Sequence, residues 1–176
     1  MNLMLDKAVY SPGEKVRCAV AGIPAEASRV SWTLFHLEEC VVALFQSVDG
    51  ETTALTLELP TEDFTGYLLR AEAQNLRGDT LATAFTAVDC SSRWTRFPRY
   101  GYVWDFTEGA DVEEKLRQLS RYHINALQFY DWQYRHHIPV APDITGWTDW
   151  TGRAIDGAAL NNYLAAAHGQ NMACMA

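Results

Sequence analysis

The apolar residues of the chain follow one pattern up to about residue 90 and another pattern beyond it. In the first part, short runs that are apolar or that alternate apolar and polar side chains are separated by turn residues such as Ser11-Pro12-Gly13. Runs of this kind indicate β-strands. We expect strands at residues 7–10, 16–20, 30–35, 41–45, 54–59, 67–73 and 80–88. Seven short strands at this spacing predict a β-sandwich.

Two positions refine the prediction for the sandwich. Trp32 follows Cys18 by fourteen residues, as a core tryptophan follows a core cysteine in antibody domains, but residues 68–73 supply no second cysteine. We therefore expect an immunoglobulin-like sandwich without the disulfide. Tyr67 opens the sixth expected strand, where it suits either a tyrosine corner or an ordinary core position.

The second part of the chain alternates strands with helices. Asp111 is a suitable N-cap for a helix over residues 112–122, with Glu114 in the capping-box position, and Asp156 is a suitable cap for a second helix that Gly169 would end. The expected apolar faces of these helices are Leu116, Leu119 and Tyr122 in the first, and Leu160, Tyr163, Leu164 and Ala167 in the second. Strands are expected at 99–106, 124–131 and from 171 onward.

A β-α-β-α-β order predicts a parallel sheet. We assign residues 1–92 to the sandwich and residues 93–176 to the start of a (β/α)₈ TIM barrel. A whole barrel takes roughly 200 residues or more, so the barrel is expected to be incomplete in this chain.

Charge and cysteine spacing exclude several classes of function. The formal net charge is −8, and residues 1–92 carry most of the acidity. An acidic chain without a lysine and arginine cluster is not expected to bind nucleic acid or an anionic membrane. The four cysteines show no C-x-x-C spacing, so isolated buried thiols are expected rather than a zinc site. His136 and His137 are adjacent, without metal-binding spacing, and we predict neither a metal site nor a cofactor.

Two long motifs resemble glycoside hydrolase family 66, which contains dextranases and cycloisomaltooligosaccharide glucanotransferases. They are AVDCSSRWTRFPRYGY at residues 87–102 and YHINALQFYDWQYRHH at residues 122–137. The resemblance is specific over residues 87–176. It is weaker over residues 1–86, where it rests on residues 10–14 and 66–68 and on a sandwich that precedes a barrel.

The resemblance implies a bacterial enzyme that acts on α-1,6-glucan (dextran) or isomaltooligosaccharides. It also implies a retaining mechanism with an aspartate nucleophile and a glutamate acid/base on later barrel strands. Neither residue has a matching position here, so we assign no catalytic residue and expect this chain alone to be inactive. An endo-dextranase is the default reading; a cyclising glucanotransferase and a non-catalytic glucan-binding or adaptor protein are the alternatives.

Substrate contacts are expected where barrel strands end, because functional side chains gather at the carboxyl ends of parallel strands. Aromatic rings that stack on sugars and carboxylates that bind hydroxyls occur together there. The candidates are Asp105, Tyr130, Asp131, Trp132 and Tyr134.

Each candidate also has a structural interpretation, such as loop capping by Asp105, core filling by Tyr130 or edge covering by Trp132. Residues 147–153 suit either a lip over the substrate cleft or a loop held in place by two buried indoles.

The family is typically exported, but the N-terminus carries no signal peptide. An extracellular location is therefore expected from the resemblance, and a cytoplasmic one stays open.

Overall fold

A computed structural model describes residues 1–175 of the chain. The chain divides into two compact units, Met1–Arg96 and Phe97–Ala176. The first unit is built almost entirely from strands, whereas the second combines strands with two helices.

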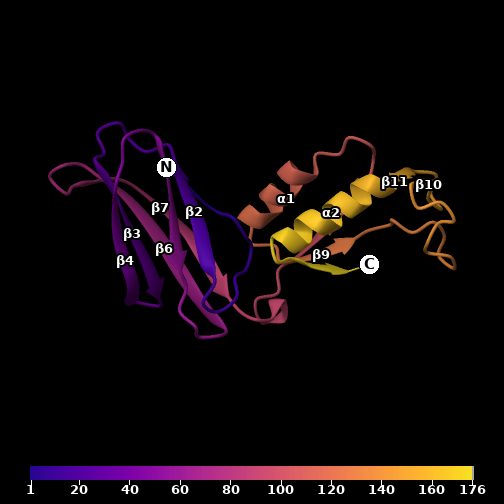
Figure 1. Ribbon diagram of the computed structural model, residues 1–176, viewed down its shortest axis with the longest axis horizontal. Helices are drawn as coiled ribbons and strands as arrows, with labels where there is room; N and C mark the ends of the chain where they lie inside the picture. Colours follow the sequence, from indigo (N-terminus) through magenta and orange to yellow (C-terminus); the bar gives the residue numbers. More distant parts are fainter. Residues whose placement is uncertain (176) are drawn as a thin grey trace. The chain divides into compact units, whose positions relative to one another are not determined.

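Seven strands in two antiparallel sheets form the first unit (Figure 1). One sheet has the order β1-β2-β5, with β1 at Asn2–Leu5, β2 at Lys15–Ala21 and β5 at Thr52–Glu58. The other has the order β4-β3-β6-β7, with β3 at Arg29–His36, β4 at Glu39–Ser47, β6 at Thr65–Gln74 and β7 at Thr80–Cys90. A 3₁₀ turn, η1, follows at Trp94–Arg96. The sandwich prediction is thus confirmed, and the strand order is compatible with an immunoglobulin-like arrangement.

The core of the sandwich lies between the two sheets. Alternate residues of β2 point inward, so that Val16, Cys18 and Val20 are buried, and the facing sheet contributes Trp32 and Leu69. Burying one such apolar side chain stabilises the fold by about 1.5–3 kcal/mol. Cys18 and Cys90 are buried thiols as expected, but Cys40 is exposed, which corrects the prediction for that residue.

The first expected strand, residues 7–10, is wrong. The strand is Asn2–Leu5 instead, and residues 7–10 lie outside any named strand. Ala8, Val9 and Tyr10 are all buried rather than alternating, and Tyr10 forms a single parallel bridge with Cys90. The Tyr10 hydroxyl donates to Asp6 Oδ1 at 2.7 Å. A buried apolar run with a single bridge resembles a strand in sequence but does not form a ladder.

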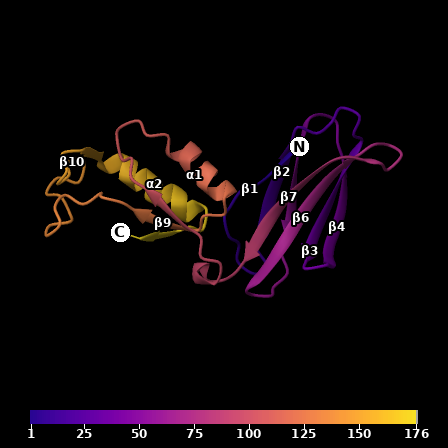
Figure 2. The ribbon, with the colours of Figure 1, turned by 180° about the vertical axis from the view of Figure 1, so that it is seen from behind.

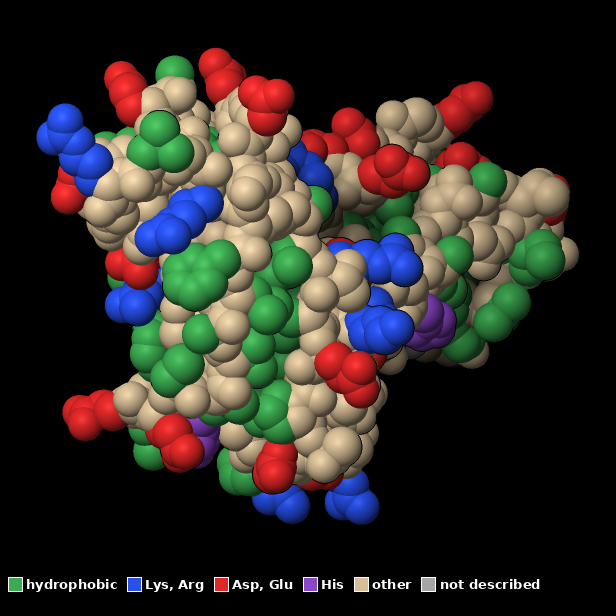
Figure 3. Space-filling model, turned by 60° about the vertical axis from the view of Figure 1, so that its left-hand side comes forward, with side chains coloured by type: hydrophobic (Ala, Val, Ile, Leu, Met, Phe, Trp, Pro, Cys, Tyr) green, Lys and Arg blue, Asp and Glu red, His purple; other side chains and the backbone are tan. Residues whose placement is uncertain are grey.

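The outer face of the four-stranded sheet carries apolar side chains (Figure 3). Phe45 and Phe85 are exposed, and so is Leu68. The guanidinium of Arg29 lies 5.2 Å from the Phe45 ring centre. Such cation–π contacts shield part of an aromatic surface from water.

The second unit is built on a three-stranded parallel sheet of order β12-β9-β8, with β8 at Tyr100–Val103, β9 at Ala126–Phe129 and β12 at Ala173–Met175. Helices α1 (Val112–Arg121) and α2 (Gly157–Gly169) lie side by side over one face of it (Figures 1 and 2). A short antiparallel hairpin, β10 (Gly146–Thr148) and β11 (Ala154–Asp156), precedes α2. The β–α alternation is confirmed. The eight-stranded barrel stays a prediction.

Both helices begin as the sequence predicts. The Asp111 side chain accepts from the backbone N–H of Glu114, and the Asp156 side chain accepts from Ala158 N–H. The Glu114 side chain binds Arg117 and Gln118, one turn further along α1. The N-terminus of each helix is therefore capped by an aspartate side chain.

Both helices end in the same motif. His123 and Asn171 have left-handed φ angles of 57° and 59°. After α1, His123 N–H donates to Ser120 O and Ile124 N–H donates to Leu119 O, and the equivalent bonds follow α2. This is a Schellman motif, normally formed by glycine. Helix α2 ends at Gly169 as predicted, but the left-handed residue of its motif is Asn171 rather than this glycine. Tyr122 lies past the end of α1 with an exposed ring, against expectation.

An aromatic cluster joins α2 to the sheet. The rings of Phe106, Phe129 and Tyr163 have centres 5.7–6.5 Å apart. Gly157 opens α2 where a Cβ would lie 1.9 Å from the carbonyl oxygen of Ile144, so only glycine fits at this point.

Candidate functional site

The carboxyl ends of β8 and β9 lie beside each other. Val103 pairs with Phe129, and the N–H of Tyr130 donates to Val103 O at 2.8 Å. Asp105 and Asp131 each follow their strand by two residues, so the register places them at equivalent positions along one edge. The sequence predicted this shared edge.

Asp105 makes contacts within its own loop. Its Oδ1 accepts from the Thr107 hydroxyl at 2.7 Å and from Thr107 N–H at 3.3 Å. The side chain is half-buried. These bonds fix the turn after β8, which agrees with the loop-capping interpretation and leaves Asp105 able to accept further bonds.

Tyr130 belongs to a row of exposed tyrosines on the sheet face opposite the helices. Tyr100 and Tyr102 alternate along β8, and their ring centres are 5.0 Å apart. The Tyr102 and Tyr130 rings are 6.4 Å apart, and the Tyr100 hydroxyl donates to Gln128. Sequence analysis missed this row, although tyrosines two residues apart in a strand signal a shared face.

Trp132 lies on the other side of the sheet. Its side chain is half-buried and, with Phe129, Leu160 and Leu164, lines an apolar pocket of about 230 Å³. Its neighbours are residues of α2 rather than the exposed tyrosines. This placement favours the packing interpretation for Trp132 over a sugar contact.

Tyr134 is held against its neighbour Arg135. The guanidinium lies 4.1 Å from the Tyr134 ring centre, and it donates to the carbonyl oxygens of Tyr134 and Thr148. The guanidinium covers one face of the Tyr134 ring. A polar ligand would therefore meet Tyr134 at its hydroxyl.

The hairpin β10–β11 occupies part of the long connection that the sequence left as a loop. Trp147 is half-buried, and its indole N–H donates to the carbonyl oxygen of Trp132 at 2.9 Å. Trp150 is exposed and packs on His136, with ring centres 4.6 Å apart. One indole therefore holds the hairpin in place and the other faces solvent. The interpretation with two buried indoles is wrong for Trp150, and the lip over a substrate cleft stays a prediction.

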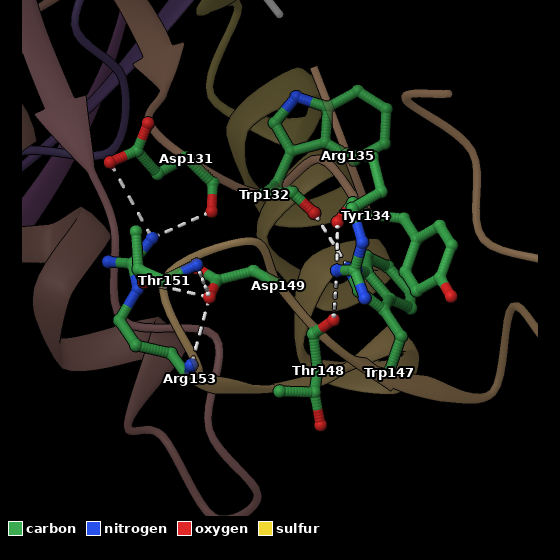
Figure 4. A network of polar contacts seen from close by, with 9 residues as sticks. All are labelled: Asp131, Trp132, Tyr134, Arg135, Trp147, Thr148, Asp149, Thr151 and Arg153. Atoms are coloured by element: carbon green, nitrogen blue, oxygen red, sulfur yellow. Dashed lines mark hydrogen bonds and ion pairs between the residues drawn. The ribbon is translucent and has the colours of Figure 1, made fainter. Parts of the chain in front are cut away.

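The turn of this hairpin is closed by Asp149 (Figure 4). Its Oδ1 accepts from Thr151 N–H, the Thr151 hydroxyl and Arg153 N–H at 2.7–2.8 Å. Its Oδ2 accepts from Arg153 Nε at 2.7 Å. Burial alone would raise the pKa of Asp149, but the hydrogen bonds from Arg153 and Thr151 lower it to about 2. We call these three residues the Asp149 turn.

The Asp149 turn reaches the strand end through Arg153. Arg153 Nη2 donates to the carbonyl oxygen of Asp131 at 2.8 Å and lies 3.7 Å from Asp131 Oδ2. Sequence analysis missed Arg153 because its partner is 22 positions away. The D-x-T-x-R spacing, which lets one carboxylate bind two residues of its own turn, was the available signal.

The arrangement can hold a polar, ring-shaped ligand. Carboxylates and tyrosine hydroxyls bind sugar hydroxyls, and exposed aromatic rings stack on their C–H faces. Among residues 1–175, no cluster of three or more histidine, cysteine or acidic side chains is arranged to hold a metal ion. Within the same residues, no helix has the length and apolar character that a membrane span requires.

Comparisons with known proteins were made over the whole chain. The model of Glycosyl hydrolase family 66 matches residues 5–176. Two cycloisomaltooligosaccharide glucanotransferases of Niallia circulans are 38% and 35% identical to 99% and 97% of the chain. The chain spans 19% of the length of each.

A crystal structure of a Paenibacillus cycloisomaltooligosaccharide glucanotransferase with cycloisomaltoheptaose matches 99% of the chain and 27% of the solved one. Its TM-score is 0.89 at 32% identity.

Proposed function

The chain belongs to glycosyl hydrolase family 66, and on this basis we propose that it is the N-terminal part of an enzyme that acts on α-1,6-glucan or isomaltooligosaccharides. The observation that carries the proposal is the family match over nearly the whole chain, together with relatives named as glucanotransferases. Because the chain spans about a fifth of those relatives, the activity is proposed for the whole protein.

We assign the substrate contacts to the edge formed by β8 and β9. Asp131 and Tyr130 are the leading residues, since they are the first two residues after β9, where functional side chains gather in a barrel. Asp105 and Tyr134 are secondary candidates because parts of both side chains are used locally. Trp132 is the weakest of the five, given its packing beside α2.

The chemistry is proposed to occur on strands that follow this segment. A retaining glycosidase uses two carboxyl groups about 5 Å apart, one as nucleophile and one as acid/base. In this proposal residues 93–176 begin the (β/α)₈ barrel that bears both groups. Residues 1–92 form the sandwich, which has a structural rather than a catalytic role in this proposal. The chain by itself is then inactive.

Transfer is favoured over hydrolysis by the printed activities of the relatives, all three of which are cycloisomaltooligosaccharide glucanotransferases. Hydrolysis by a dextranase differs only in the acceptor, which is water rather than a sugar hydroxyl. The product mixture therefore distinguishes the two activities.

The test begins with the coding sequence beyond Ala176. Further β–α units with an aspartate and a glutamate at strand ends are expected; a stop codon after Ala176 would remove the enzyme proposal and favour a glucan-binding or adaptor protein. The full-length protein is then incubated with dextran, and the products are separated by chromatography. Cyclic products indicate transfer, linear isomaltooligosaccharides indicate hydrolysis, and unchanged dextran contradicts the proposal.

The site assignment is tested separately in the full-length protein. Asp131→Asn should raise KM for isomaltooligosaccharides or lower kcat, because the carboxylate is replaced by an amide of the same shape. Asp143→Asn is the matched control, since the exposed Asp143 accepts two bonds from Thr145 within its own turn. Equal kinetics for the two variants would contradict the assignment of Asp131.

A further inference from the structure

Arg153 connects a surface hairpin to the end of a buried strand. Its guanidinium bridges Asp149 in the turn between β10 and β11 and Asp131 after β9 (Figure 4). The contact with Asp131 is double, because one nitrogen donates to the backbone carbonyl at 2.8 Å and lies 3.7 Å from Oδ2.

Asp131 has a backbone conformation that needs support. Its φ is 52°, in the left-handed region that L-residues rarely adopt. The chain leaves β9 next to this residue. A donor bound to its carbonyl oxygen fixes the peptide that follows, and the same guanidinium nitrogen, 3.7 Å from Oδ2, restrains the carboxylate.

Arg153 is itself held in place before it meets Asp131. Its Nε binds the buried Asp149, which is 3% exposed, and its backbone N–H binds the same carboxylate. A free arginine side chain loses conformational freedom when it is ordered. Here that loss is shared with the closure of the turn, so the guanidinium of Arg153 is preorganised toward Asp131.

We propose that Arg153 is a positioning residue for Asp131, holding its carboxylate oriented toward a hydroxyl of the glucan. This inference rests on the proposed function, in which Asp131 contacts substrate. The guanidinium faces Oδ2, so Oδ1 is the oxygen that accepts from the sugar hydroxyl. Arg153 itself makes no contact with the sugar in this arrangement.

The test is a double-mutant cycle on the full-length enzyme with an isomaltooligosaccharide substrate. Loss of one charge-assisted contact lowers kcat/KM by about tenfold or more, so Arg153→Met should have an effect of that size. The same substitution in an Asp131→Asn background should change kcat/KM by less than about twofold, because the group it positions is gone.

Two further variants complete the design, together with thermal unfolding of every variant. Arg117→Met removes an arginine that pairs with Glu114 on α1, and it should leave kcat/KM unchanged. Arg153→Lys keeps the charge but lacks the planar guanidinium with its several N–H donors. Its kcat/KM should therefore fall between those of wild type and Arg153→Met. It also serves as the test variant if Arg153→Met does not fold.

Thermal unfolding of each variant separates loss of activity from loss of structure. Multiplicative effects of the Arg153 and Asp131 substitutions would overturn the positioning role while leaving the proposed function intact. An Asp131→Asn enzyme with wild-type kinetics would instead overturn the site assignment, and the positioning role with it.

Discussion

Replacing Asp149 by asparagine tests how the hairpin turn is stabilised. The amide of Asp149→Asn keeps the shape of the side chain and retains one oxygen, which can still accept the three bonds now made by Oδ1. Its NH₂ group would face Arg153 Nε, where the carboxylate now accepts at 2.7 Å. A donor then meets a donor, and the arginine loses the partner that holds it.

The magnitude follows from the titration of Asp149. Its pKa is lowered from 3.8 to about 2, and one pKa unit corresponds to about 1.4 kcal/mol, so ionisation of Asp149 stabilises the folded turn by about 2 kcal/mol. Because the folded pKa is depressed, this contribution is present above about pH 4 and is lost as the pH falls toward 2. The asparagine variant lacks it at every pH.

Hydrogen exchange of the backbone amides of Thr151 and Arg153 is the appropriate assay, since it reports local opening. At neutral pH a loss of about 2 kcal/mol should accelerate exchange roughly 30-fold in the variant. The difference from wild type should shrink at pH 2–3. Asp143→Asn should alter exchange in the Asp149 turn by less than about twofold.

Exchange rates in Asp149→Asn that match wild type at neutral pH would refute the reasoning. So would a difference that persists unchanged at pH 2, because the charge of Asp149 would then not be its source.

Three other substitutions or reactions probe the rest of the fold. Cys40 should react rapidly with a thiol reagent in the native chain, and Cys40→Ser should abolish that fast phase, because Cys40 alone of the four is exposed and burial raises the pKa of Cys18, Cys90 and Cys174. Gly157→Ala should lower the free energy of unfolding by more than about 2 kcal/mol, whereas Gly169→Ala, with open space around its Cβ, should change it by less than about 1 kcal/mol in thermal unfolding. Asn171→Gly should raise the melting temperature slightly, since glycine adopts the left-handed conformation without strain; a lowered one would contradict the capping argument.

The sequence predicted those elements whose signal is local. Asp111 and Asp156 mark helix starts because the capping bond joins residues two or three positions apart. Asp131 follows an apolar run, so its place at a strand end was readable from the pattern alone. Such features depend on neighbours along the chain, which a single sequence displays.

Other features depend on neighbours that only folding brings together. Residues 7–10 were predicted as a strand because the pattern cannot distinguish a buried apolar segment with a single bridge from a fully paired strand. Trp132 read as a surface aromatic, yet its neighbours Leu160 and Leu164 come from a helix about thirty positions later. The β10–β11 hairpin has strands of three residues, too short for a periodic signal.

The candidate site shows the same division. Asp131 and Tyr130 were identified from the strand they follow, and both remain assignments to be tested. Sequence analysis missed the exposed row of Tyr100 and Tyr102 because it assigned residues 99–106 to a strand without considering the two faces of that strand separately. Arg153 was overlooked because its second partner belongs to a different strand end.

The Asp149 turn has a practical use that follows from how its bonds are distributed. Every bond of its carboxylate is made to a residue no more than four positions away. A five-residue segment whose carboxylate bonds are all internal can be transplanted as a unit into hairpins of other scaffolds. Such a graft would place a preorganised arginine beside a chosen carboxylate of the host. Turns of different length would change how far that arginine extends, while the strands of the host stay the same.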